Sequence, residues 1–279
     1  MYLIQNGKTI KETSASISPN NRSFRYGDGC FETMKVMKGK LLLKEAHFNR
    51  LFQTLTILGF TIPQYFTAIN LENEILQLVS KNNHLKLARV RLTVYRGDGG
   101  LYDEVSHQPN YLIQTWDLNP QSNKLNENGL VIDVFEEGRK VCDGFSALKT
   151  NNFLVYTMAA IWAKRQHLND ALVLNPFNNI ADATIANVFI IKDSIIKTPS
   201  LTDGAINGIM RSHLLFQLPL INMEVQQTSL SLIDLLEADE LFLSNSIYGI
   251  KWVSELKHRK YSNKIVSYIH QKAIAPLFV

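Results

Sequence analysis

One segment, residues 149–187, joins a lysine to a carboxylate through a short run of regular elements. Lys149 is followed by two residues that commonly begin helices, and apolar side chains then recur at helical spacing over residues 153–167. The apolar run 171–175, which a proline ends, predicts a buried strand, and an Asn-Asn turn leads from it to Asp182. The order of lysine, helix, strand, turn and carboxylate restricts the chain to a fold that mixes helices with strands.

The length and composition of the chain favour two domains. Its 279 residues, of which 46% are hydrophobic and 19% charged, are enough to bury a large core. The stretch from residue 117 to 128 is polar and contains an Asn-Pro pair, which is typical of a linker. We therefore predict a small N-terminal α/β domain over residues 1–118 and a larger C-terminal domain over residues 124–279.

The composition argues against several classes of protein. The net charge is +4, but the densest basic cluster, residues 257–260, is short and lies beside a predicted turn, so we expect no nucleic-acid binding. Cys30 and Cys142 are too few for a disulfide framework, and no Cys or His residues have zinc-ligand spacing, so we expect no metal. No apolar run has the length of a membrane span, and the N-terminus does not resemble a signal peptide. These features favour a cytoplasmic protein without a membrane partner.

Two motifs in the N-terminal half contain residues suited to an active site. Residues 26–33, YGDGCFET, place two glycines around an aspartate, which in isolation favours a tight turn before a strand. Residues 45–59 have apolar side chains at helical spacing, and His47 and Arg50 project from one side of this helix. An arginine at such a position is commonly a surface residue. Its planar, permanently charged guanidinium also suits bidentate binding of a phosphate.

Three features of the later chain lie in loops or at the ends of elements. Residues 203–211 place a glycine directly before a predicted helix, where backbone N–H groups and the helix dipole favour an anion; a plain glycine-bearing loop is the alternative. The loop 96–102 contains three glycines but no Gly-Lys-Ser/Thr, so a mobile active-site loop fits better than a phosphate loop. A predicted strand ends in Asn245 and Ser246, small polar residues that commonly form a turn.

The motifs YGDGCFET, HFNRL, Lys149, Asp182 to Asn187, NGIMR and SNS occur in this order, and together they resemble the class IV aminotransferase family of fold-type IV pyridoxal phosphate (PLP) enzymes. That family includes aminodeoxychorismate lyase and the branched-chain and D-amino acid aminotransferases. The resemblance covers nearly the whole chain. It implies a two-domain α+β (mixed α/β) fold with pyridoxal 5'-phosphate in the cleft between the domains, and a homodimer whose subunits both line the sites.

The resemblance also implies roles for individual residues. Lys149 forms the Schiff base with PLP and then acts as general base and acid. Asp182, as an anion, keeps the pyridine nitrogen protonated so that the ring accepts electrons. Arg50 grips the phosphate, to which Ile209 and Met210 offer backbone N–H groups. The other expected cofactor contacts are Ile206, Asn245 and Ser246, and the expected substrate pocket comprises Phe31, Leu101, Tyr102 and Tyr248.

The sequence departs from the family pattern at two positions. Asp182 stands where glutamate is more common, and because its side chain is one methylene shorter, the ring must lie nearer or a water must bridge. Relatives that bind a substrate carboxylate often carry an arginine near the position of Leu101, and none is present there.

The motifs favour one reaction over a second. GDGCF, NGIMR and SNSIYGI resemble the lyase, so the favoured reaction is that of aminodeoxychorismate lyase, which forms 4-aminobenzoate and pyruvate in the folate pathway. Glu32, Asp182 and Trp252-Val253 are not distinctive of the lyase. An amino-acid aminotransferase of the branched-chain or D-amino acid type, with a 2-oxo acid acceptor, is therefore the alternative, and a non-catalytic ligand-binding relative is a third possibility.

Overall fold

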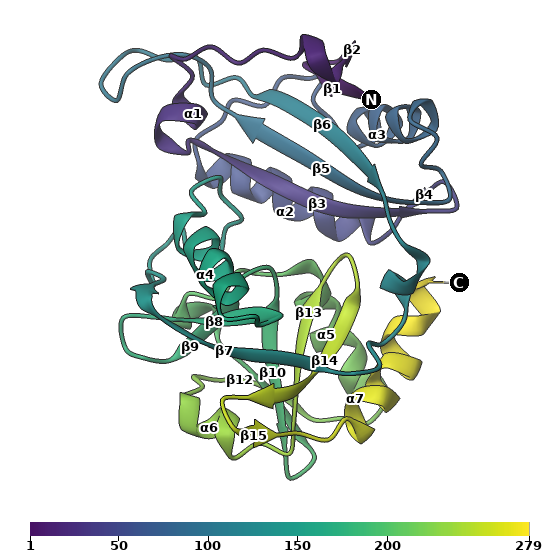
Figure 1. Cartoon of the computed structure of the whole chain (residues 1–279). Coiled ribbons are helices and arrows are strands. Elements are labelled where there is room, and N and C mark those ends of the chain that lie inside the picture. Colours follow the sequence, from purple (N-terminus) through teal and green to yellow (C-terminus); the bar gives the residue numbers. More distant parts are fainter. Residues whose placement is uncertain (279) are drawn as a thin grey trace. The chain divides into compact units, whose positions relative to one another are not determined.

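The computed structural model describes residues 1–278 and divides them between two compact units (Figure 1). The first contains Met1–Pro120 and the short segment Lys149–Phe153, and the second contains Gln121–Leu148 and the chain from Leu154 onward. The main division falls within the polar stretch that the sequence marks as a linker. No change in composition indicates that Lys149–Phe153 belongs to the first unit.

The first unit is built on a six-stranded antiparallel sheet with strand order β2-β1-β6-β5-β3-β4 (Figure 1). Its strands are β1 (Tyr2–Gln5), β2 (Lys8–Lys11), β3 (Gly29–Met37), β4 (Lys40–Leu41), β5 (Leu87–Tyr95) and β6 (Asn110–Asp117). In the β3–β5 pair, Phe31 lies opposite Thr93 and Thr33 lies opposite Arg91. Because side chains alternate along a strand, these four share one face of the sheet.

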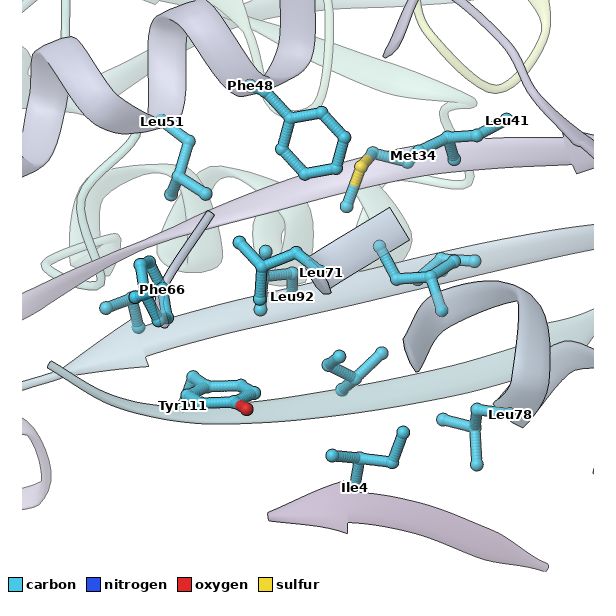
Figure 2. Close-up of a cluster of buried hydrophobic side chains, with 14 of the residues drawn as sticks. Ile4, Met34, Leu41, Phe48, Leu51, Phe66, Leu71, Leu78, Leu92 and Tyr111 are labelled. Atoms are coloured by element: carbon cyan, nitrogen blue, oxygen red, sulfur yellow. The ribbon is translucent and has the colours of Figure 1, made fainter. Parts of the chain in front are cut away.

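The opposite face of this sheet is covered by two helices, α2 (Lys44–Ile57) and α3 (Ala68–Lys81). Figure 2 shows Phe48 of α2 beside Met34 of β3, and Leu51 of α2 pointing toward the strands. The apolar side chains of both helices recur every three or four residues, so burial of that stripe against the sheet stabilises them. A short helix, α1 (Arg22–Tyr26), precedes β3 and is capped by the side chain of Asn21.

The second unit is built on a nine-stranded mixed sheet with strand order β12-β11-β10-β13-β14-β7-β8-β9, and β15 pairs with β14 (Figure 1). Its strands are β7 (Leu130–Arg139), β8 (Asp170–Leu174), β9 (Ile180–Ala183), β10 (Asn187–Lys192), β11 (Ile195–Thr198), β12 (Val225–Gln227), β13 (Glu240–Asn245), β14 (Gly249–Leu256) and β15 (Arg259–Lys260). Strand β7 runs parallel to both β8 and β14. β9 and β10, which are fully or almost fully buried, hold Asp182 and Asn187.

Within the residues that the structure describes, the second unit has four α-helices. They are α4 (Leu154–Arg165), α5 (Ile209–Leu220), α6 (Leu232–Leu236) and α7 (Lys264–Ile269), and α7 continues into a π-helical turn, His270–Ile274. Short 3₁₀ turns occur at Glu12–Ser14, Pro120–Asn123, Leu201–Asp203 and Ala275–Phe278. Within residues 1–278, no helix is both long and apolar enough to cross a membrane.

The helix expected directly after Lys149 begins later than the sequence predicts. Thr150 forms a bridge with Cys30 of β3, and the Asn151 N–H donates to the Gly29 carbonyl at 2.9 Å. The two residues with helix-starting character are therefore held in extended backbone against β3. Helix α4 begins only at Leu154.

Candidate active site

Lys149 is fixed against β3 of the first unit by its own backbone. The Lys149 carbonyl accepts a hydrogen bond from the Phe31 N–H at 2.9 Å. The lysine Nζ lies 4.6 Å from the ring centre of Phe31 and 5.2 Å from that of Phe153, and these two rings meet edge to face. Gly29 permits this arrangement, because a Cβ there would lie 2.6 Å from Asn151 Nδ2 and 2.3 Å from the Val94 carbonyl oxygen. The Lys149 amino group therefore lies beside two aromatic rings.

A second cation, Arg91 of β5, packs on the same phenylalanine. Its guanidinium carbon lies 3.7 Å from the centre of the Phe31 ring, and its Nε donates to Thr93 Oγ1 at 3.2 Å. Burial, together with the neighbouring charge of Arg89, lowers the pKa of Arg91 to about 10, so the guanidinium stays charged at neutral pH. Lys149 and Arg91 thus both flank Phe31, and Arg91 can attract a carboxylate.

Arg50, the expected phosphate anchor, lies in a buried group with Glu32 and His47. Arg50 donates from Nε to Glu32 Oε1 at 2.7 Å and from Nη2 to Glu32 Oε2 at 2.6 Å, while His47 Nδ1 lies 2.7 Å from Oε2. Burial alone would raise the pKa of Glu32, but the Arg50 charge and the hydrogen bonds from His47 and Arg50 outweigh it and lower the pKa to about 2. Burial also lowers the pKa of His47, which favours a neutral ring that donates from Nδ1. Glu32 therefore fixes the direction of the Arg50 guanidinium.

Asp182, the expected partner of a ring nitrogen, is buried on β9 among hydrogen-bond donors. Its Oδ2 accepts from Tyr156 Oη at 2.8 Å and from the Ile206 N–H at 2.9 Å, and its Oδ1 accepts from Asn187 Nδ2 at 2.7 Å. Lys140 Nζ lies 3.6 Å from Oδ2. These contacts hold the carboxylate in one orientation.

Two cations act on this carboxylate. Burial raises the pKa of Asp182, and the Lys140 charge together with the hydrogen bonds oppose that rise. Burial lowers the pKa of Lys140, and it also lowers that of Arg211, which is buried in the same unit and feels the Asp182 charge. Lys140 and Arg211 therefore both interact with the Asp182 charge, and Lys140 also feels the charge of Asp143.

The start of helix α5 is shaped by Gly208. A Cβ on Gly208 would lie 1.9 Å from Asn187 Oδ1, so only glycine leaves space for the amide that binds Asp182. Gly208 occupies the N-cap position without a side-chain capping bond, and the N–H groups of Ile209 and Met210 follow it. The first N–H groups of a helix have no partner within the helix and suit an anion.

The predicted residues after β13 form a turn. Asn245 Oδ1 accepts from the N–H groups of Ile247 and Tyr248, so this side chain holds the turn between β13 and β14. Ser246 is half-buried in the same turn. Tyr248 is buried, and burial together with the Asp170 charge raises the pKa of its hydroxyl.

The loop after β5 is anchored at its base by Arg96. This buried guanidinium donates to Asp28 at 3.1 Å, and its Nη1 lies 2.8 Å from His107 Nδ1. Asp28 belongs to the YGDGCFET motif, so the motif and the loop base are tied together. Leu101 and Tyr102, farther along the loop, are 62% and 100% exposed.

Comparison with known proteins assigns the chain to a family. Residues 29–256 match the model of the amino-transferase class IV family. The chain belongs to this family. Its members are PLP-dependent aminotransferases and lyases, so the chain is a PLP-dependent enzyme.

Two relatives of this family member and one solved structure illustrate the range of the family. An aminodeoxychorismate lyase of Vibrio harveyi is 30% identical over 84% of this chain and 85% of its own length. A putative branched-chain-amino-acid aminotransferase of Methanocaldococcus jannaschii is 30% identical over 98% of this chain and 93% of its own. The structure of a T.th. branched-chain amino acid aminotransferase complexed with N-(5'-phosphopyridoxyl)-L-glutamate has a TM-score of 0.87 at 18% identity and covers 99% of this chain and 94% of its own. The expected fold type is confirmed.

The residues of this class IV family member fit PLP. The N–H groups at the start of α5 suit a phosphate, and the carboxylate of Asp182 suits a protonated pyridine nitrogen. In the second unit, Ser244 Oγ and Arg211 Nε are buried without a hydrogen-bond partner among the described residues. Lys149 supplies a primary amine in the first unit.

The structure groups the predicted residues by unit. Within the first, Lys149 meets Phe31; within the second, Asp182 bonds directly to Ile206, and Asn245 holds the turn that contains Ser246 and Tyr248. Several residues with site-like contacts were not predicted: Glu32 and Arg91 in the first unit, and Lys140, Tyr156 and Asn187 in the second. Glu32 and Asn187 lie within the quoted motifs, and alternation along residues 87–95 places Arg91 on the face of the sheet opposite the core.

Proposed function

We propose that this class IV aminotransferase is an aminodeoxychorismate lyase, which releases 4-aminobenzoate and pyruvate from one substrate. The observation that carries the proposal is the similarity to lyases of Vibrio harveyi and Bacillus subtilis, each 30% identical over most of this chain. The motifs GDGCF and NGIMR support the same choice. In the structure their glycines Gly29 and Gly208 stand where a side chain would collide with Asn151 or Asn187.

The proposed roles follow from the chemistry of each group. PLP supplies an electron sink for the substrate carbon. Lys149 holds the cofactor and carries protons to and from the substrate, and Asp182 keeps the ring nitrogen protonated. Arg50, directed by Glu32, binds the phosphate.

The remaining roles are shared between backbone and side chains. The N–H groups of Ile209 and Met210 bind the phosphate. Since the Asn245 side chain is used in its own turn, we assign its contact with the cofactor, like that of Ile206, to positioning, and assign the direct contact to Ser246. The proposed substrate pocket comprises Phe31, Leu101, Tyr102 and Tyr248, to which we add Arg91 as the carboxylate-binding group.

A second candidate is an amino-acid aminotransferase with a 2-oxo acid acceptor. The similarity to the Methanocaldococcus jannaschii protein, over 98% of this chain, favours it. Arg91 suits this reaction as well, because amino acids and 2-oxo acids both carry a carboxylate.

We also propose a homodimer that works in the cytoplasm. The family resemblance supports the dimer, and the two free thiols of Cys30 and Cys142 suit a reducing compartment. Sedimentation of the active protein is expected to give twice the mass of one chain. A fully active monomer would contradict the dimer.

The deciding experiment supplies the purified, PLP-loaded enzyme with aminodeoxychorismate, and separately with branched-chain or D-amino acids plus 2-oxoglutarate. Rapid release of 4-aminobenzoate without amino transfer is the expected result. Fast conversion of the cofactor to its pyridoxamine form by a simple amino acid, without 4-aminobenzoate, would support the aminotransferase instead. Lys149→Ala serves as the control and should abolish both reactions and the borohydride-sensitive absorbance of the bound cofactor.

A further inference from the structure

Lys140 is a buried lysine that no motif predicted. It directly follows β7, whose pairing with β8 shifts register between Phe135 and Arg139, and its own N–H donates to the Leu174 carbonyl at 2.8 Å. The Nζ donates to the Ser146 carbonyl at 2.7 Å and lies 3.6 Å from Asp182 Oδ2, and the side chain is only 9% exposed. Burying an ammonium group without a charged partner costs free energy. The nearby Asp182 carboxylate therefore stabilises the buried Lys140.

The contacts around Asp182 indicate that its ionised form depends on Lys140. Three groups donate hydrogen bonds to its two oxygens: Tyr156 Oη, Asn187 Nδ2 and the Ile206 N–H. The charged or titratable groups that act on it are Lys140, Tyr156 and Arg211. Of these, only Lys140 forms an ion pair with Asp182 within the described chain. Its removal would leave a carboxylate buried on all sides without that pair.

We propose that Lys140 is a positioning residue that holds Asp182 ionised and thereby keeps the ring nitrogen of the cofactor protonated. This proposal rests on the proposed function, because it takes Asp182 as the partner of the ring nitrogen. Lys140 Nζ lies 3.6 Å from Asp182 Oδ2, so its charge lowers the proton affinity of that carboxylate. With a neutral side chain at position 140, Asp182 would bind a proton more tightly and would compete for it with the ring nitrogen of a bound cofactor.

The contact with Ser146 offers a competing explanation, in which Lys140 only ties down the segment 140–146. The segment is also held without Lys140, because Ser146 Oγ donates to the Val141 carbonyl at 2.8 Å and accepts from the Asp143 N–H at 2.8 Å. Three substitutions separate the two roles. Lys140→Gln keeps a donor without charge, Lys140→Arg keeps the charge, and Lys140→Met removes both.

The experiment reconstitutes each variant with PLP labelled with ¹⁵N in the ring and follows the nitrogen chemical shift against pH. We expect Lys140→Met and Lys140→Gln to lower the midpoint of ring protonation by about one pH unit or more, a tenfold change in proton affinity, and Lys140→Arg to restore it. Lys251→Met is the matched control, since Lys251 lies in the same unit and acts on a different buried carboxylate, Asp170. It should leave the midpoint unchanged. Unchanged midpoints in both neutral Lys140 variants would overturn the proposal.

A second measurement needs no cofactor. In the apoprotein, Lys140→Met should raise the equilibrium constant for unfolding about tenfold or more, and by less than about threefold in an Asp182→Asn background, because the pair no longer exists there. Equal increases in the two backgrounds would overturn the pairing. One outcome is that the wild-type protein loaded with PLP lacks borohydride-sensitive absorbance while the unfolding measurements still show coupling between Lys140 and Asp182. In that case the proposed function fails, and the Lys140–Asp182 ion pair is supported. If the absorbance is present and neither measurement responds to Lys140, only the inference fails.

Discussion

Gly208→Ala is the substitution for which the structure gives the sharpest expectation. The φ of Gly208 is −68°, which any residue adopts, so alanine would introduce no backbone strain. Its Cβ would, however, lie 1.9 Å from Asn187 Oδ1. To reach even 3.0 Å, a distance below which such contacts essentially never occur, the amide must move by 1.1 Å.

The cost follows from the hydrogen bonds that this movement disturbs. Asn187 Nδ2 donates to Asp182 Oδ1 at 2.7 Å and to the Ile206 carbonyl at 2.8 Å. A bond to a charged group contributes about 1.5–3 kcal/mol and a neutral one about 0.5–1.5 kcal/mol. The lower chain entropy of alanine in the unfolded state offsets about 0.4–1 kcal/mol. We expect Gly208→Ala to lower the free energy of unfolding by about 1–4 kcal/mol.

Chemical denaturation of the apoprotein, followed by circular dichroism, measures this change. Gly144→Ala is the matched control, because a Cβ at Gly144 has no atom within 4 Å, and it should change the free energy of unfolding by less than about 0.5 kcal/mol. The double variant Asn187→Ala/Gly208→Ala removes the colliding amide. It should be at least as stable as Asn187→Ala alone, because only the entropy gain of about 0.4–1 kcal/mol then remains.

Two results would refute this reasoning. A stable Gly208→Ala variant would mean that Asn187 has room to move without losing its bonds. An equal cost of Gly208→Ala with and without the Asn187 amide would place the effect elsewhere, for example at the start of α5. PLP binding by Gly208→Ala should fall together with stability, since Asp182 loses a donor.

Three further predictions concern other site residues. Arg50→Ala should weaken PLP binding about tenfold to a hundredfold, because a charge-assisted contact contributes about 1.5–3 kcal/mol; an unchanged dissociation constant in equilibrium dialysis would count against the phosphate role. Asp182→Asn should keep the absorbance of the lysine-bound cofactor but slow turnover, and full activity would mean that another group protonates the ring. The pKa of Glu32, lowered from 4.5 to about 2, implies that its ionised form stabilises the fold above pH 4.5 and that this is lost as the pH falls through 2. Between about pH 5.5 and pH 3, urea denaturation should show a loss of about 2 kcal/mol that is missing in Glu32→Gln; equal losses in both proteins would contradict the shift.

Hydrophobic periodicity predicts much of the fold. The spacing over residues 45–59 corresponds to α2 (Lys44–Ile57), and the alternating apolar side chains along residues 87–95 correspond to β5 (Leu87–Tyr95). Both elements bury one regular stripe or face, so the local pattern and the tertiary packing agree. The start of α4 could not be predicted, because the backbone of Thr150 and Asn151 pairs with β3, which lies more than a hundred residues earlier in the chain.

The candidate site shows the same division between local and distant signals. Lys149 and Asp182 lie within motifs, so their residue types and order suggested a chemistry. Lys140 and Tyr156 carry no motif, and their approach to Asp182 depends on an irregular end of β7 and on the position of α4, neither of which the pattern of residues encodes. Glu32 was noted only as uncharacteristic of a lyase, and its pairing with Arg50 requires the packing of α2 on β3.

Under the role proposed for Asp182, the contacts of its two oxygens indicate which of them would accept a hydrogen bond from the ring nitrogen. Oδ2 accepts from Tyr156 and Ile206 and lies beside Lys140, whereas Oδ1 accepts from Asn187 alone among the groups that the structure describes. Each carboxylate oxygen has two lone pairs, so Oδ1 keeps one acceptor position. Oδ1 is therefore the atom best suited to accept a ring N–H, and Asn187 fixes its direction. Gly208 leaves the space that the Asn187 amide occupies, and this amide donates to Asp182 Oδ1. A larger residue at position 208 that moves Asn187 would therefore also change the direction of Asp182 Oδ1.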